Sequence, residues 1–241
     1  MIDFCVSFTT IPSRISDIKK TVDSINNQTL KPSKIFLNLP DKYKRFNNYE
    51  FTTKQLLTLE KLNIEINRCE DYGPSTKLMG SLKKIKDFEC VIILDDDHIY
   101  QKEIFEIFID KYKKKKGNYS YYVQKVFNLN MGQGADCILI ETKDLGKIEN
   151  FYQSHVKNNI NLFLNDDLWI SLYLQFIAKN KILDISDIYK QKTNKELVYE
   201  IHTNKDSLNE TIKKGFINRR KIAKLEYLRF KIKNYFNNFF Q

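Results

Sequence analysis

The sequence predicts an α/β protein built on an open sheet. Short apolar segments rich in β-branched residues alternate with longer segments of helical periodicity. One of these, residues 91–94, runs directly into three consecutive aspartates, Asp95, Asp96 and Asp97. An apolar run this short indicates a strand buried on both faces, and adjacent carboxylates repel one another and end it. Ligands of open α/β sheets bind at the carboxyl ends of the strands, so we expect the functional site beside these acids.

The composition is compatible with one sizeable domain. The chain has 241 residues, 42% of them hydrophobic, and a formal net charge of +10. This excess favours an anionic partner such as a nucleotide, a phosphorylated lipid, an acidic glycan or a membrane surface. Lysine, asparagine and isoleucine are abundant throughout, as an AT-rich genome would produce. The charge is therefore weak evidence for nucleic acid, and no nucleic-acid partner is expected.

The ends of the chain and its cysteines favour a reducing compartment. Met1 leads directly into a strand-like segment, without a signal peptide, and no apolar run reaches the roughly 18 residues of a spanning helix. The cysteines lie far apart in or beside apolar runs, which indicates buried free thiols. They are Cys5, Cys69, Cys90 and Cys137. We expect a cytoplasmic protein.

The first strand, expected over residues 3–9, ends in a hydroxyl-rich turn at residues 9–14, Thr-Thr-Ile-Pro-Ser-Arg. Pro12 and Ser13 interrupt the strand and can open a helix. Such a turn, with Arg14 beside it, suits a diphosphate or a base. An ordinary helix cap beside a surface arginine explains it equally well.

A second loop motif lies at residues 71–77, Asp-Tyr-Gly-Pro-Ser-Thr-Lys, after strands expected over 32–39 and 64–67 and a helix over 52–62. Gly73 and Pro74 break regular structure, and Ser75 or Thr76 can cap the helix that follows. Lys77 then lies in the first turn of that helix, where the helix dipole disfavours a cation unless a phosphate is nearby. A solvated lysine is the alternative.

The second half is expected to contain a helix over 104–112 and strands over 119–126, 137–140 and 182–188. Gly132 and Gly134 precede the strand at 137–140 and could let the backbone approach a ligand closely. Asp166 and Asp167 fall at the start of a helix. A carboxylate there is ordinarily a cap, but a second acid pair is also what a two-carboxylate mechanism needs.

From residue 212 onward the chain is basic and aromatic. Apolar residues recur every three or four positions among lysines and arginines, which predicts a basic amphipathic helix. The apolar positions are Ile222, Leu225, Leu228, Ile232, Tyr235 and Phe239. Packing on the protein's own core or in a homodimer is the plainer interpretation, and an anionic membrane surface is the alternative. We place the one domain boundary so that residues 1–203 form a domain and 204–241 a helical extension.

A divalent cation could bind at the three aspartates, because Mg²⁺ and Mn²⁺ take oxygen ligands, usually one or two carboxylates plus substrate phosphates. A solvated acidic turn is the alternative. His202 follows another apolar run and is either a third metal ligand or a surface imidazole.

Four motifs, in this order, resemble those of GT-A glycosyltransferases, in particular family-2-like members that use nucleotide sugars. They are the turn at 9–14, the segment 71–77, the DxD-type acids 95–97 and the segment 165–169, Asn-Asp-Asp-Leu-Trp. The resemblance implies a Rossmann-like three-layer α/β/α sandwich with a mostly parallel central sheet. It also implies a metal-dependent hexosyl- or N-acetylhexosaminyltransferase. The donor would be UDP-linked, and the acceptor a hydroxyl on a glycan, lipid or protein.

The same resemblance implies roles for the acids. Asp95 would lie nearer the ribose or sugar, and Asp97 would ligate Mn²⁺ or Mg²⁺, with His202 as a late metal ligand. The motif around His202 is poor. Asp166 or Asp167 would deprotonate the acceptor in an inverting reaction. The family's acid pair is often Glu-Asp, which leaves the choice open, and we favour Asp167.

The remaining roles implied by the resemblance concern the donor and acceptor pockets. The nucleotide pocket would be lined by Thr9, Pro12 and Arg14, with Asp71 facing the base. Lys77 would reach the diphosphate or sugar, and Asp96 would join the donor-binding residues. Gly132 and Gly134 resemble the glycines before the strand that floors the acceptor site.

Two other functions stay open. A nucleotidyltransferase that makes nucleotide sugars also uses an α/β sheet with acid-bound Mg²⁺, but usually carries a glycine-rich basic loop after its first strand, and the turn at 9–14 contains no glycine. A catalytically inactive module of the same fold, binding a glycan or a membrane surface, is the other. Intact acids at each expected place argue against it.

Overall fold

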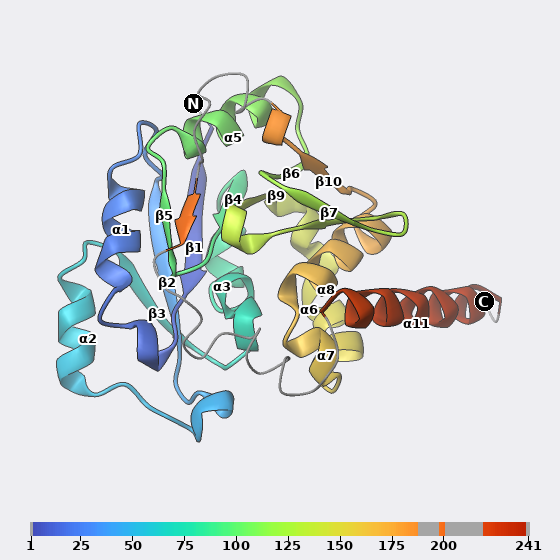
Figure 1. The fold of residues 1–241 in the computed structure, drawn as a ribbon, viewed down its shortest axis with the longest axis horizontal. Coiled ribbons are helices and arrows are strands. Elements are labelled where there is room, and N and C mark those ends of the chain that lie inside the picture. The colour runs from blue at the N-terminus through green and yellow to red at the C-terminus, as the bar shows by residue number, and fades with distance from the viewer. Residues whose placement is uncertain (1, 188–197, 201–218, 240–241) are drawn as a thin grey trace.

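A computed structural model describes residues 2–187, 198–200 and 219–239 and confirms the three-layer α/β/α architecture (Figure 1). Its central sheet has seven strands in the order β10-β6-β9-β4-β1-β2-β3. β9 runs antiparallel to β4 and β6, and the other neighbouring pairs are parallel. The strands are β1 (Phe4–Thr9), β2 (Lys34–Pro40), β3 (Glu65–Cys69), β4 (Cys90–Ile93), β6 (Asn118–Ser120), β9 (Ile138–Glu141) and β10 (Ile182–Asp184).

The central strands are buried on both faces, as their apolar sequences predict. In β4, Val91 and Ile93 belong to one hydrophobic core, whereas Cys90 and Ile92 belong to a second core on the opposite face. This alternation follows from the two-residue period of a strand. The sheet therefore separates two cores and is covered by helices on each side.

Helices of the two layers come from different parts of the chain (Figure 1). One face is covered by α1 (Ile18–Asn26), α2 (Thr53–Glu60) and α5 (Ile104–Lys114). The other is covered by α3 (Thr76–Met79), α4 (Leu82–Ile85), α6 (Ile148–Phe151), α7 (Ile160–Phe163) and α8 (Asp166–Leu172). Short 3₁₀ turns are η1 (Pro12–Arg14), η2 (Lys44–Phe46), η3 (Gly73–Ser75), η4 (Gly134–Asp136) and η5 (Thr142–Lys147), and π turns are η6 (Tyr152–Val156) and η7 (Tyr173–Ile177).

Two small sheets flank the central one, and two expected strands have different bounds in the structure. The strand expected over 119–126 divides into β6 and β7 (Val123–Val126), and β7 pairs with β8 (Leu129–Gly132) as a hairpin. β5 (His98–Tyr100) pairs with β11 (Val198–Glu200). The strand expected over 182–188 stops at Asp184, whose carboxylate accepts hydrogen bonds from backbone amides of Val123 and Ser186.

The C-terminal helix, α11 (Arg219–Phe239), forms as predicted, but its core-facing side does not coincide with the recurring apolar positions. Ala223, Tyr227 and Phe230 are buried, whereas Leu225 and Leu228 are about half exposed, at 51% and 48%. Aromatic packing explains this orientation, since Phe230 lies 5.7 Å from both Phe151 and Phe176 between ring centroids. The proposed boundary near residue 204 lies outside the described residues.

The thiol prediction is confirmed, since all four cysteines are free, three buried and Cys69 partly so. Within the described part of the chain, none of the helices combines the length and apolarity needed to cross a membrane.

A close approach of α3 to the sheet depends on Gly80, which separates α3 from α4. A Cβ atom on Gly80 would lie 2.8 Å from Asn38 Cβ and 2.8 Å from the carbonyl oxygen of Thr76. Neither neighbour is the mobile end of a long side chain, so a methyl group would push α3 away from β2.

We therefore expect Gly80→Ala to destabilise the fold by about 1–3 kcal/mol through overpacking. Gly146→Ala is the control, because a Cβ atom there meets no atom within 4 Å. It should change the free energy of unfolding by less than about 0.5 kcal/mol. Urea denaturation measures both, and equal effects would contradict the proposed close approach.

Candidate active site

The sheet topology gathers the predicted motifs at one edge. β1 and β4 are parallel neighbours, so the turn after β1 and the aspartates after β4 leave the sheet together. β9 is antiparallel to β4, with Ile138 opposite Ile93, and its amino end therefore brings η4 and Gly134 to the same edge. α8 packs beside β8 and contributes the second acid pair.

Lys77 connects the two acid clusters. Its ammonium group is ion-paired with Asp95, which follows β4, and lies 2.9 Å from Asp166 Oδ2 at the start of α8. The contact with Asp166 is an ion pair and not a directed hydrogen bond, because within the described chain Asp166 Oδ2 has no hydrogen-bond partner. The lysine side chain is 4% exposed, so it is not solvated, and its partners in this structure are carboxylates.

The protonation state of Lys77 follows from these contacts. Burial alone would lower the pKa of Lys77, but the carboxylates of Asp166 and Asp95 outweigh it and raise the pKa well above its ordinary value. Lys77 is therefore charged at neutral pH. Its charge offsets the repulsion between acids that come from two distant segments of the chain.

Arg14 plays the corresponding part for the other two aspartates. Its Nη1 atom lies 2.7 Å from Asp96 Oδ1 and 2.8 Å from Asp97 Oδ2. Asp96 also accepts a 2.5 Å hydrogen bond from the Thr10 hydroxyl. Burial raises the pKa of Asp96 against the opposing effect of Arg14. Each of the three consecutive acids thus has a cationic partner from another element.

Asp97 has a second partner that the sequence analysis did not single out. His98 Nδ1 lies 2.6 Å from Asp97 Oδ1. Burial would raise the pKa of Asp97, but the hydrogen bond with His98 and the charge of Arg14 together lower it. The adjacency of His98 to the acids was the one available signal.

Tyr100 was also missed, and nothing in its local sequence marks it. Its hydroxyl accepts a 3.0 Å hydrogen bond from the Asp95 amide, and the carbonyl oxygens of Asp95 and Ala135 lie 3.0 and 3.3 Å away as acceptors for its one proton. It therefore connects the turn after β4 to η4.

Gly134 is placed against the acids. Its backbone N–H donates a 2.9 Å hydrogen bond to Asp167 Oδ1. A Cβ atom on Gly134 would lie 2.5 Å from Lys77 Nζ and 3.3 Å from Asp95 Oδ1. A side chain at this position would therefore have to displace the Lys77 ammonium group. The structure therefore brings Lys77, Asp95, Asp166, Asp167 and Gly134 together.

Gly132 lies apart from this group. It is buried in β8, where its N–H donates to Ser171 Oγ and a Cβ atom would meet Ile182 and Ile138. Its position is explained by packing.

Two predicted nucleotide-pocket residues have local structural partners. Asp71 is 6% exposed, and its carboxylate accepts hydrogen bonds of 2.7 Å from the amides of Lys44 and Gly73. The Thr9 hydroxyl donates to the Asn38 carbonyl oxygen at 2.7 Å. Pro12 is the first residue of η1 and is partly exposed. His202 lies outside the described residues.

The acids after β4 carry oxygen atoms of the kind that bind a hard divalent cation. Asp95 and Asp97 offer carboxylate oxygens, the class that Mg²⁺ and Mn²⁺ prefer, and the Asp95 side chain is 33% exposed. Across the described residues, no group of three His, Cys, Asp or Glu side chains could hold a metal ion. Mg²⁺ is usually bound by one or two carboxylates together with substrate phosphates.

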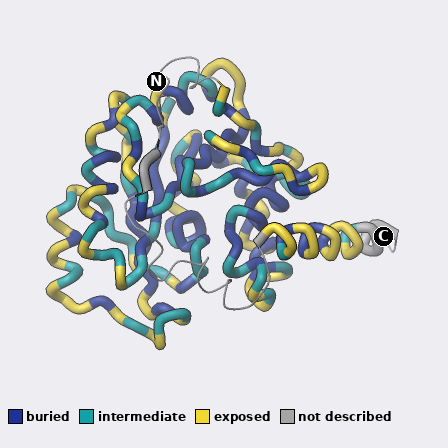
Figure 2. The backbone as a smooth tube through the Cα atoms, viewed as in Figure 1, coloured by how far each residue is buried: buried dark blue, intermediate teal, exposed yellow. Residues whose placement is uncertain are grey.

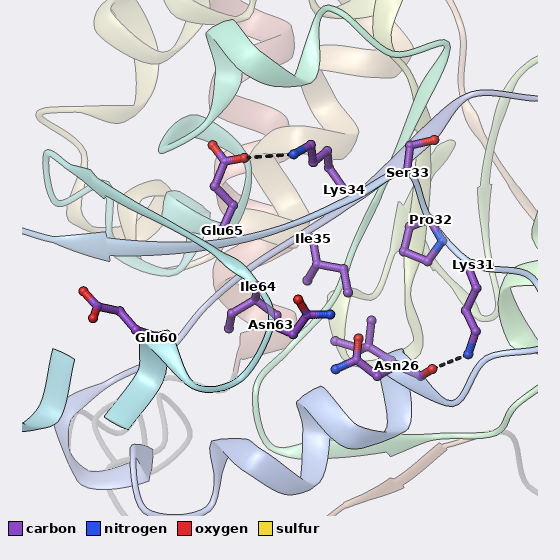
Figure 3. Close-up of a pocket in the computed structure, with 11 residues that line it drawn as sticks. Asn26, Lys31, Pro32, Ser33, Lys34, Ile35, Glu60, Asn63, Ile64 and Glu65 are labelled. Atoms are coloured by element: carbon purple, nitrogen blue, oxygen red, sulfur yellow. Dashed lines mark hydrogen bonds and ion pairs between the residues drawn. The ribbon is translucent and has the colours of Figure 1, made fainter. Parts of the chain in front are cut away.

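A separate cavity of about 860 Å³ lies at the amino-terminal ends of β2 and β3. Figure 3 shows two contacts among the residues that line it, one between Lys34 and Glu65 and one between Lys31 and the carbonyl oxygen of Asn26. The acids after β4 lie at the opposite, carboxyl-terminal edge of the sheet, and none of the predicted site residues lines this cavity.

No family model and no curated protein matches the sequence. Solved structures do match in fold. The mannosyltransferase PcManGT from Pyrobaculum calidifontis, in complex with GDP-Man and Mn²⁺, aligns at 13% identity and TM-score 0.54 over 78% of this chain and 57% of its own. Residues 1–349 of S. aureus TarS, in complex with UDP, align at 17% identity and TM-score 0.51 over 77% and 58%.

A cytidylyltransferase from Leptospira borgpetersenii also aligns, at 11% identity and TM-score 0.51 over 96% of this chain and 94% of its own. These similarities establish a GT-A-like α/β fold. The chain spans less than two thirds of the TarS and PcManGT structures.

Replacing Lys77 by methionine should destabilise the fold strongly. Breaking a buried ion pair leaves uncompensated charge and costs about 3–5 kcal/mol. Lys84→Met is the matched control, because Lys84 pairs with Glu65 at 2.8 Å on the surface, where its side chain is 46% exposed. Such pairs contribute about 0–1 kcal/mol. Urea denaturation curves with similar losses for both variants would show that Lys77 does not hold the acid clusters together.

Proposed function

We propose that the protein is a glycosyltransferase that moves a sugar from a nucleotide-sugar donor to an acceptor hydroxyl. One observation supports this proposal above the others. The buried Lys77 pairs with both clusters of carboxylates, the one after β4 and the one at the start of α8. This contact lies at the edge of the GT-A-like sheet where open α/β proteins bind ligands. In the proposed reaction, carboxylates beside the leaving diphosphate would hold a divalent cation, and a separate carboxylate would take the proton of the attacking hydroxyl. The two clusters provide both.

The donor would lie across the carboxyl ends of β1 and β4. Thr9, Pro12 and Arg14 would line the nucleotide pocket, and Asp71 would face the base from the neighbouring loop. Lys77 and Arg14 would stabilise the negative charge that gathers on the diphosphate.

The acids after β4 would complete the donor site. Asp95 and Asp97 would hold the divalent cation, with Asp96 beside them and His202 as a further ligand. Bound Mn²⁺ or Mg²⁺ would act as a Lewis acid on the leaving diphosphate. Support for this assignment comes from the carboxylate oxygens of Asp95 and Asp97, the ligand class that these ions prefer, and from the Mn²⁺ in the PcManGT structure.

Asp167 is our choice for the general base. Asp166 is 3% exposed and ion-paired with Lys77, so its carboxylate is committed to the interior. Asp167 is more exposed, and the Gly134 amide holds it at 2.9 Å. A base must face the acceptor, and of the pair Asp167 is better placed to do so. Attack on the face opposite the diphosphate would invert the anomeric centre through an oxocarbenium-like transition state.

The finer identity of the substrates rests on the resemblance. We propose a UDP-linked hexose or N-acetylhexosamine as donor and a glycan, lipid-linked or protein acceptor, with Gly132 and Gly134 supporting the floor of the acceptor site.

A nucleotidyltransferase is the second candidate, favoured by the near-complete alignment with the cytidylyltransferase. The two activities differ in products. A glycosyltransferase releases a nucleoside diphosphate from a nucleotide sugar, whereas a nucleotidyltransferase releases pyrophosphate from a nucleoside triphosphate and a sugar phosphate. An inactive module would do neither.

Asp167→Asn should reduce sugar transfer about 10²- to 10⁴-fold, the usual contribution of general base catalysis. Donor affinity by calorimetry should remain unchanged, because the acid faces the acceptor. Asp166→Asn is the matched comparison and should act mainly through stability, since it loses the charge that faces Lys77. Transfer is measured with a panel of acceptor sugars, and the product anomer by NMR.

Retained configuration in the product, or transfer by Asp167→Asn at the wild-type rate, would remove Asp167 from the base role. Loss of donor binding in the same variant would place it in the donor site instead.

A further inference from the structure

α11 carries an apolar stripe on the side turned away from the protein. Leu225, Leu228 and Ile232 are 51%, 48% and 57% exposed. At 3.6 residues per turn these positions share one side of the helix. The residues that pack on the core, Ala223 and Tyr227 among them, lie on the opposite side. The stripe is therefore not a part of the core contact.

The charges around the stripe have one sign. Residues 219–239 contain seven lysines and arginines and a single acid, Glu226. Glu226 is 2% exposed and its carboxylate is bound by Asn159, Asn161 and Arg229. The exposed cations fall on both flanks of the stripe. On one flank lie Lys224 and Lys231, and on the other Arg229 and Lys233.

The helix is also accessible to a large partner. Figure 1 shows α11 beginning against α7 and α8 and then projecting away from the rest of the chain. Figure 2 shows exposed residues along it. Leu225, Leu228 and Ile232 are therefore at the surface of the described part of the protein, where a partner can reach them.

We propose that the outer side of α11, defined by Leu225, Leu228 and Ile232 with their flanking cations, docks on the surface of an anionic lipid bilayer. An amphipathic helix with basic residues beside an apolar stripe lies in the membrane interface with its apolar side chains inserted. Lysines and arginines near anionic lipids each add attraction. The inference does not depend on the proposed transferase activity.

The positive charge beside the stripe argues against a second copy of this chain as the partner that covers it. A two-fold contact through the stripe would place the same patch on both partners, and the flanking cations would face cations with no exposed acid on α11 to compensate. Three side chains also provide little of the roughly 1,200–2,000 Å² that a stable interface buries. An anionic surface meets neither difficulty.

The test is co-sedimentation of the full chain with vesicles of phosphatidylcholine alone or with about one third phosphatidylserine, at low and physiological salt. Wild type should bind the anionic vesicles, and less at higher salt. The double variant L228Q/I232Q should bind at least about tenfold more weakly, since two inserted side chains are lost. Leu57→Gln is the matched control, because Leu57 is 53% exposed on α2, and it should bind like wild type.

This comparison separates the insertion of apolar side chains into the bilayer from electrostatic attraction between the protein and anionic lipids. L228Q/I232Q keeps every charge, so the net charge of +10 alone would bind it as tightly as wild type. Equal binding of the two proteins would overturn the proposal, as would wild type failing to bind anionic vesicles at low salt. A wild-type dimer in solution that L228Q/I232Q dissociates, without vesicle binding, would assign the stripe to a second copy.

Discussion

The structure depends on one buried ammonium group, that of Lys77. Placing a charge in the interior costs several kcal/mol unless oppositely charged groups surround it, and here Asp95 and Asp166 do so. In this arrangement α3 approaches the sheet at Gly80, where a Cβ atom would collide with Asn38 and Thr76. The backbone passes the ammonium group at Gly134. Two acids 71 residues apart in sequence, at 95 and 166, are thereby fixed in one site.

Arg14 extends the same principle to Asp96 and Asp97. Cations from the segments after β1 and β3 thus face carboxylates from the segment after β4 and from the start of α8. A site with both signs of charge in close contact suits a ligand that itself combines a diphosphate with a divalent cation, as a nucleotide sugar does when it binds with metal. The GT-A-like fold places this site at the edge of the sheet where open α/β proteins bind ligands.

Much of this was predictable, and the exceptions have physical reasons. The branched apolar run before Asp95 identified β4 and, through it, the edge of the sheet that carries the acids. The partners of Lys77 could not be foreseen, because they depend on how closely α3 approaches β2. The hydrogen bonds of Asp71 with backbone amides of its own neighbourhood could not be foreseen from the sequence, and its place beside the base stays a prediction. In α11 both sides carry apolar residues, so periodicity alone does not show which side is buried. The packing of Phe230 against Phe151 and Phe176 determines it.

The most direct test of the account is the unfolding midpoint of the protein with a panel of nucleotide sugars, in Mn²⁺ and in EDTA. A ligand that binds only the native state stabilises it by about 2.7 kcal/mol at 100 times its dissociation constant. The account predicts that at least one nucleoside diphosphate sugar raises the midpoint in Mn²⁺, and that EDTA or Asp97→Ala removes most of the rise. The absence of any shift across the panel, or a shift that is the same in EDTA and in Asp97→Ala, would contradict it.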